Sequence, residues 1–283
     1  MLIIDCHAHI TSFDERRYQP KDKPFRPPRG VGSAEHLRQV SQANGVTAVR
    51  AIQTVSFYGY DNRYLCDSAK RYSSWMTGVC TLNPDDPHSA LDLRRFVREY
   101  NVTSLRTIPS LRAKTFDDPG VRTLVKVAAD EGISIDLFLM RREHVPGAVK
   151  LLSEFPKLVA AFCHSMDLKP GPELKEDLRA VLELARFPNL YPKVDFIGTG
   201  TKQGFPGADL HAPCLEIIRA YGAERCLWAS SYPNDIWTPK ITYAEHLRIF
   251  AEVLPLTPPE RALILGENAR RLWFPKLAAT ANA

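Results

Sequence analysis

Residues 3–9, Ile3-Ile4-Asp5-Cys6-His7-Ala8-His9, form an apolar run that ends in two histidines two positions apart. In an extended strand, residues two apart point to the same side. We therefore expect His7 and His9 to present their imidazoles side by side at the C-terminal end of a strand. Such a pair can bind a metal ion or polarise a carbonyl group. Alone it is a weak signal, because short motifs arise by chance.

This run is the first of eight strand-like runs that alternate with longer amphipathic segments. Strands that alternate with helices predict a parallel α/β fold. Ser33 and Asp118 are predicted helix N-caps, and Gly45 and Gly132 are predicted helix ends. We place the strands near residues 2–6, 47–53, 76–81, 103–108, 133–139, 158–163, 190–196 and 225–229.

Eight βα units predict a single (β/α)8 TIM-type barrel, whose active site lies at the C-terminal ends of the strands. An open Rossmann-like sheet is the competing architecture. No Gly-x-Gly-x-x-Gly fingerprint follows any predicted strand, which favours the barrel because dinucleotide-binding sheets carry that signature.

Length and composition are those of one ordinary globular domain. The 283 residues are close to the ~250 typical of one barrel. We expect one domain over residues 1–277 and a disordered tail over 278–283. The hydrophobic fraction of 45% and the charged fraction of 24% are ordinary for soluble proteins. No apolar run approaches the ~20 residues that cross a bilayer, and no signal peptide precedes the first strand, so we expect a cytoplasmic protein.

The net charge of +5 is mildly basic, and lysines and arginines are spread along the chain. Nucleic-acid binders gather them in a stripe, whereas a modest positive charge steers small anions to a cleft. We expect a small-molecule acidic substrate, no nucleic acid and no membrane partner; a homo-oligomer stays open. The six cysteines include no Cys-x-x-Cys pair, so we interpret them as reduced core residues.

Two further residues sit where a barrel would bring them to the mouth. His164 ends the run 158–163, so it would join His7 and His9. Arg106 lies inside a strand-like run, where an unpaired arginine is costly to bury. Its guanidinium suits bidentate capture of a carboxylate. A buried ion pair with an acid such as Asp136 is an equally good interpretation.

The segment 55–62 concentrates hydroxyls, aromatic rings and an amide after the second strand. Such groups can line a substrate pocket, and a tight turn with Asp61 capping the next helix explains the segment equally well. The substrate-binding candidates, besides Arg106, are Ser56, Tyr58, Asn62, Tyr191 and Asn234.

Several short segments carry a resemblance to a known family through their order and spacing. They are residues 4–9, 58–62, 78–84, His164, 191–194, 227–233 and 266–273. Together they resemble the amidohydrolase superfamily, specifically its amidohydrolase-2 branch of metal-dependent hydrolases, lactonases and carboxy-lyases. The resemblance covers nearly the whole chain and implies a (β/α)8 barrel with its site at the strand ends.

Ser231 departs from the family pattern. In the family, an aspartate at this strand-eight position binds metal, takes a proton from the attacking water, or does both. A neutral hydroxyl replaces a carboxylate neither as an anionic ligand nor as a general base near neutral pH. Two explanations stay open. One is an engineered Asp→Ser substitution made to trap substrate, favoured by the intact surrounding segment; the other is descent from an enzyme whose chemistry changed.

The predicted fifth strand is the second departure, because many family members place a histidine ligand there and residues 133–140 contain none. Zinc normally keeps three protein ligands, so His7, His9 and Ser231 would hold a metal poorly. This pattern resembles the metal-independent lactonases of the branch, such as 2-pyrone-4,6-dicarboxylate lactonase. The resemblance implies that His7, His9 and His164 polarise a lactone carbonyl, that Arg106 binds a substrate carboxylate, and that Ser231 occupies the position of the base.

The expected function is hydrolysis of a lactone or cyclic ester of a carboxylated small molecule. The missing base predicts binding with slow or no turnover. A second interpretation is a carboxy-lyase of an aromatic or unsaturated acid, with zinc or manganese on His7, His9 and His164. A third is a catalytically degenerate barrel that binds a carboxylated ligand. The cofactor is thus expected to be either absent or one divalent metal.

Overall fold

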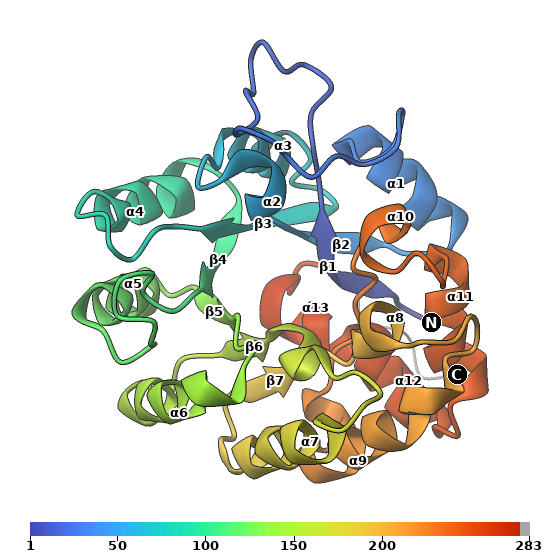
Figure 1. Ribbon diagram of the computed structural model, residues 1–283. Coiled ribbons are helices and arrows are strands. Elements are labelled where there is room, and N and C mark those ends of the chain that lie inside the picture. Colours follow the sequence, from blue (N-terminus) through green and yellow to red (C-terminus); the bar gives the residue numbers. More distant parts are fainter. Residues whose placement is uncertain (278–283) are drawn as a thin grey trace.

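Seven parallel strands lie side by side in chain order and curl around a common axis (Figure 1). In this computed structural model, residues 1–277 are described; the predicted tail at 278–283 lies outside them. Most strand residues are buried, as expected for a parallel sheet covered by helices. The strands are β1 (Ile4–His9), β2 (Ala48–Ile52), β3 (Met76–Thr81), β4 (Val102–Thr107), β5 (Ser134–Leu137), β6 (Ala160–Phe162) and β7 (Leu190–Pro192).

The eighth predicted strand, 225–229, is not a regular strand. Isolated bridges instead pair Leu227 with Lys193, just after β7, and Tyr232 with Ala8 of β1. The backbone of Ser231 is left-handed, with φ of 55°, and such a residue interrupts an extended strand. The segment still joins β7 to β1, so the predicted TIM-type barrel is confirmed with an irregular eighth position.

Helices surround the sheet on its outer side (Figure 1). The predicted caps are confirmed: Ser33 Oγ accepts from the His36 amide at 3.1 Å, and Asp118 Oδ1 accepts from the Gly120 amide at 2.8 Å. Gly45 and Gly132 follow helices with φ of 71° and 68°, a conformation that glycine adopts without strain. The helices are α1 (Ala34–Ala43), α2 (Val55–Tyr58), α3 (Arg63–Arg71), α4 (Ser89–Glu99), α5 (Pro119–Asp130), α6 (Val145–Glu154), α7 (Leu174–Glu183), α8 (Phe196–Gly200), α9 (His211–Tyr221), α10 (Asn234–Trp237), α11 (Tyr243–Arg248), α12 (Pro258–Ala262) and α13 (Asn268–Trp273).

The six cysteines are free and buried, as predicted. Within residues 1–277, no helix has the length and apolar character needed to cross a membrane.

A buried ionic network lies among the strands, where barrels usually hold branched apolar side chains. Asp136 of β5 accepts from Arg50 of β2 at 2.6 Å and also pairs with Lys193. All three side chains are fully buried. The Ser104 hydroxyl of β4 donates to Asp136 Oδ1 at 2.7 Å, and the Arg50 guanidinium lies 3.6 Å from the ring centroid of Trp273 in α13. One carboxylate therefore joins groups from several elements.

Arg50 and Lys193 also set the charge state of Asp136. Burial by itself would raise the pKa of this carboxyl, but the two cations outweigh that effect and hold the pKa below its ordinary value. Asp136 is therefore an anion that pairs with two cations, and each of these three buried charges is stabilised by its partners.

We expect Asp136→Ala to lower the free energy of unfolding by about 3–5 kcal/mol, because it leaves two buried cations without their carboxylate. Denaturant unfolding followed by circular dichroism measures the change. Lys126→Ala is the matched control, since it breaks the exposed Lys126–Asp130 pair and should cost less than about 1 kcal/mol. Equal losses in the two variants would contradict a structural role for the network.

Candidate active site

A cavity of about 630 Å³ opens at the C-terminal ends of the strands. Its wall is mainly apolar with a few polar groups, the usual character of a small-molecule site. Of the residues singled out in the sequence, His9, His164, Ser231, Arg106 and Ser56 line it. The other lining residues are Val55, Ile108, Pro109, Leu111, Phe138, Met140, Arg141, His144, Asp167, Lys169, Thr199 and Trp237.

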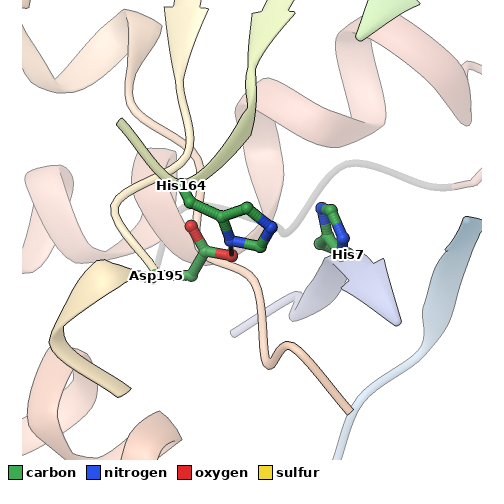
Figure 2. Close-up of side chains that lie close together, drawn as sticks. All are labelled: His7, His164 and Asp195. Atoms are coloured by element: carbon green, nitrogen blue, oxygen red, sulfur yellow. Dashed lines mark ion pairs between the residues drawn. The ribbon is translucent and has the colours of Figure 1, made fainter. Parts of the chain in front are cut away.

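Asp195 lies directly behind two of the lining residues. Its Oδ2 is 2.8 Å from His164 Nδ1, an ion pair drawn in Figure 2, and accepts from Ser231 Oγ at 2.9 Å. Asp195 is fully buried and does not line the cavity. A carboxylate against Nδ1 leaves the opposite ring nitrogen, Nε2, available to other partners, and in Figure 2 that nitrogen lies on the side of the ring toward His7.

Asp195 is held as an anion despite its burial. Burial alone would raise its pKa, but His164, Lys193 and the Ser231 hydroxyl together bring the pKa below its ordinary value. Its second oxygen, Oδ1, has no hydrogen-bond partner among residues 1–277. The side-chain contacts of this carboxylate are therefore with His164 and Ser231, which both line the cavity.

The backbone around both lining residues is strained. His164 has φ of 53° and the next three residues are also left-handed; Ser231 has φ of 55°. Such conformations cost on the order of 1–3 kcal/mol each and persist where surrounding contacts hold them. Ser165 Oγ donates to the carbonyl of Lys193 at 2.8 Å, and the Ser231 amide donates to the carbonyl of His7 at 2.9 Å. These bonds fix the directions of His164 and Ser231.

His7 and His9 form a directed chain of hydrogen bonds. The Lys193 ammonium, which can only donate, lies 3.2 Å from His7 Nδ1. His7 therefore carries its proton on Nε2, which lies 3.1 Å from His9 Nε2. His9 Nδ1 lies 3.0 Å from the carbonyl oxygen of Ile52, which can only accept. The direction runs from Lys193 through His7 and His9 to Ile52.

Both histidines are kept neutral. Burial, then the charge of Lys193, puts the pKa of His7 well below its ordinary value. Burial, then the charge of Arg106, lowers the pKa of His9 to about 3. In these tautomers neither imidazole has a free N–H for a carbonyl, and His7 does not line the cavity. The arrangement therefore does not support the expectation that His7 and His9 polarise a substrate directly.

Arg106 is a buried cation that lines the cavity. Its Nε donates to Thr81 Oγ1 at 2.8 Å and its Nη2 to the carbonyl of Gln53 at 2.9 Å. The alternative partner, Asp136, binds Arg50 and Lys193 instead. Among the described residues, Arg106 has no ion pair. Burial lowers its pKa, which reflects the cost of a charge without a counter-ion.

Four predicted substrate-binding residues do not line this cavity. The Tyr58 hydroxyl accepts from the Ser12 amide at 2.7 Å. Asn62 Nδ2 donates to the carbonyl of Thr81 at 2.9 Å, so it joins the start of α3 to the end of β3. Asn234 Nδ2 donates to Thr238 Oγ1 at 2.7 Å, and Tyr191 packs against a second cluster of core residues. These contacts place Tyr58, Asn62, Tyr191 and Asn234 away from the cavity wall, and a role in substrate binding stays a prediction for them.

Asp195 is the site residue that sequence reasoning missed. A signal existed, because Lys193 and Asp195 are two apart at the end of the seventh strand and extended backbone places such residues on one side. With His7 and His164, Asp195 also forms a set whose ligand atoms lie within 4.8 Å of one another. By distance alone, these three residues could hold a metal ion.

Comparisons with known proteins assign the family. A family model described as Amidohydrolase matches residues 4–274. No curated protein sequence matches the chain.

Solved structures share the fold at low sequence identity. A probable 2-pyrone-4,6-dicarboxylic acid hydrolase from Acinetobacter baumannii with bound citric acid is 17% identical, with a TM-score of 0.75 over 96% of this chain and 99% of that one. A zinc-bound amidohydrolase from Burkholderia multivorans is 19% identical, with a TM-score of 0.76 over 96% and 99%. The 5-carboxyvanillate decarboxylase of Sphingomonas paucimobilis is 15% identical, with a TM-score of 0.61 over 96% and 98%. Because the family model covers nearly the whole chain, this protein belongs to the amidohydrolase family.

Proposed function

We propose that this protein hydrolyses a lactone or other cyclic ester that carries a free carboxylate. The observation that carries the proposal is Arg106, a buried guanidinium at the cavity wall with no carboxylate partner among residues 1–277. A substrate carboxylate would supply the missing counter-ion through a charge-assisted bond. The citric acid bound to the structural relative from Acinetobacter baumannii is consistent with an acidic ligand in this fold.

Two aromatic side chains of the cavity wall suit the planar, uncharged ring of a lactone. Phe138, whose ring centroid lies 5.3 Å from the Arg106 guanidinium, and Trp237 offer flat apolar surfaces for a planar ring. The His164 imidazole lines the same cavity. A lactone held by Arg106 at its carboxylate would place its ester carbonyl within the cavity that His164 faces.

The same residues do not fit a divalent metal in this arrangement. His7, His164 and Asp195 have the composition of a catalytic zinc set. However, a ligating imidazole nitrogen must be unprotonated. In His7 that nitrogen is Nδ1, which faces the Lys193 ammonium, while Nε2 donates to His9. Arg106 adds a further positive charge against His7. We therefore propose a metal-independent reaction.

Hydrolysis is tested by following proton release in weak buffer with a panel of carboxylated lactones and pyrones, with and without chelator. We expect turnover that the chelator does not change. Loss of lactone turnover with chelator would contradict the metal-independent reaction, and release of carbon dioxide from aromatic acids would instead support the carboxy-lyase. Ligand binding without any turnover would support the degenerate barrel.

We expect Arg106→Met to lower kcat/KM for a carboxylated lactone by roughly 10- to 100-fold, the value of a hydrogen bond to a charged group. The methyl ester of the same lactone is the matched substrate, and the variant should no longer distinguish it from the free acid. Because Arg106 also bonds Thr81 and Gln53, thermal unfolding checks the fold. A variant that still prefers the free acid by the parent's ratio would contradict the assignment.

We expect Lys193→Met to bind zinc at least about tenfold more tightly than the parent. The change removes the ammonium from His7 Nδ1 and leaves Arg50 to pair with Asp136. Isothermal titration with Zn²⁺ measures the difference. Lys169→Met is the control, since this half-exposed lysine also lines the cavity but pairs with Asp167. A parent protein that already binds one zinc tightly would contradict the role given to Lys193.

A further inference from the structure

The carboxylate that strand eight lacks has a counterpart on the neighbouring strand. Asp195 follows β7, and its Oδ2 reaches 2.9 Å from Ser231 Oγ, the side chain at the position of the family aspartate. Both residues are fully or almost fully buried. Asp195 therefore places a carboxylate next to position 231, where the family pattern has an aspartate and this chain has a serine.

Ser231 and Asp195 exclude a second carboxylate at the same place. The Ser231 hydroxyl donates to Asp195. An aspartate at position 231 would instead bring two carboxylates to about this separation, and like charges so close in a buried site repel strongly. Serine is small and can donate, so it suits position 231 when position 195 is an acid. Ser231 and Asp195 thus form a matched pair in which one carboxylate is present.

His164 connects this carboxylate to the cavity. Asp195 lies 2.8 Å from Nδ1 and does not reach the cavity itself, whereas the imidazole lines it. No described residue forms a hydrogen bond with His164 Nε2, and the ring lies beside His7 with centroids 4.4 Å apart (Figure 2). The 2.8 Å separation places a carboxylate against Nδ1, where it favours a proton on that nitrogen, and this is the tautomer in which Nε2 can accept a proton.

We propose that Asp195, acting through His164, performs the task of the missing strand-eight aspartate, so that the chain is competent in hydrolysis with Ser231 in place. This inference rests on the proposed lactone hydrolysis. Asp195 is a positioning residue, and His164 is the group that meets the reacting water. Ser231 donates its hydroxyl to Oδ2, the same carboxylate oxygen that lies against His164.

The proton balance follows from these positions. His164 Nε2 takes one proton from water as the water oxygen bonds to the lactone carbonyl carbon. The ring C–O bond then breaks, and the same proton passes from Nε2 to the leaving alkoxide oxygen. The second proton of the water is lost to solvent when the new carboxylic acid ionises. Asp195 stays ionised throughout and stabilises the transient imidazolium.

The test compares the parent with Asp195→Asn, Ser231→Asp and the double variant. Asp195→Asn should lower kcat by roughly 10³- to 10⁴-fold, as loss of the carboxylate does in Ser-His-Asp hydrolases, with KM within threefold. Ser231→Asp should lower kcat at least tenfold when made in the parent, yet raise kcat at least tenfold when added to the Asp195→Asn variant. This reversal of sign is not expected if Asp195 only supports the fold.

Two kinetic results would overturn the inference while leaving lactone hydrolysis intact: a kcat for Asp195→Asn within threefold of the parent, or a higher kcat in Ser231→Asp alone. If none of the four proteins turns over any lactone, the proposed function fails and nitrogen-15 NMR of the histidines still tests the pair. We expect His164 to be protonated at Nδ1 in the parent and to lose this preference in Asp195→Asn. An unchanged tautomer would overturn the role of Asp195.

Discussion

The ion pair between Lys193 and Asp136 is the constraint on which the site depends. Asp136 is a fully buried anion that needs cations, and Lys193 supplies one of them from the end of β7. Once fixed there, the ammonium lies 3.2 Å from His7 Nδ1 and sets the direction of every following hydrogen bond to Ile52. A network that belongs to the barrel interior thereby determines the protonation pattern at its mouth.

This pattern divides the three strand-end histidines, His7, His9 and His164, into two kinds. His7 and His9 are neutral, and their ring nitrogens are engaged by protein groups. His164 lines the cavity, its Nδ1 lies 2.8 Å from Asp195 Oδ2, and no described residue forms a hydrogen bond with its Nε2. Similar residue types at similar strand ends therefore have different chemistry, because what an imidazole can do depends on which of its two nitrogens is already engaged.

The barrel, its caps and the cavity-facing positions of His164 and Arg106 were predictable because they follow from local patterns. Strand and helix alternation, N-cap residues and strand-end positions each depend on neighbours in the sequence. Asp195 was not predicted as part of the site, although its spacing from Lys193 was visible. Its partners, His164 and Ser231, lie 31 and 36 residues away on other strand ends, and only the closed barrel brings them together. For the same reason, the sequence left open whether Arg106 pairs with Asp136. The ion pairs of Asp136 with Arg50 and Lys193 join residues far apart in the chain.

Strain at the mouth is consistent with a site that needs fixed directions. His164 and Ser231 both adopt left-handed backbone, which an unconstrained chain would avoid, and hydrogen bonds to the backbone of Lys193 and His7 hold the two segments in place. Asp5 of β1 adds to this, because its carboxylate accepts from the Ser230 amide at 2.9 Å. If the backbone at either residue relaxed, His164 or Ser231 would move away from the Asp195 oxygen that both side chains contact. Since a single carboxylate oxygen must meet both His164 and Ser231, the strained geometry is the condition under which one acid can serve two strand ends.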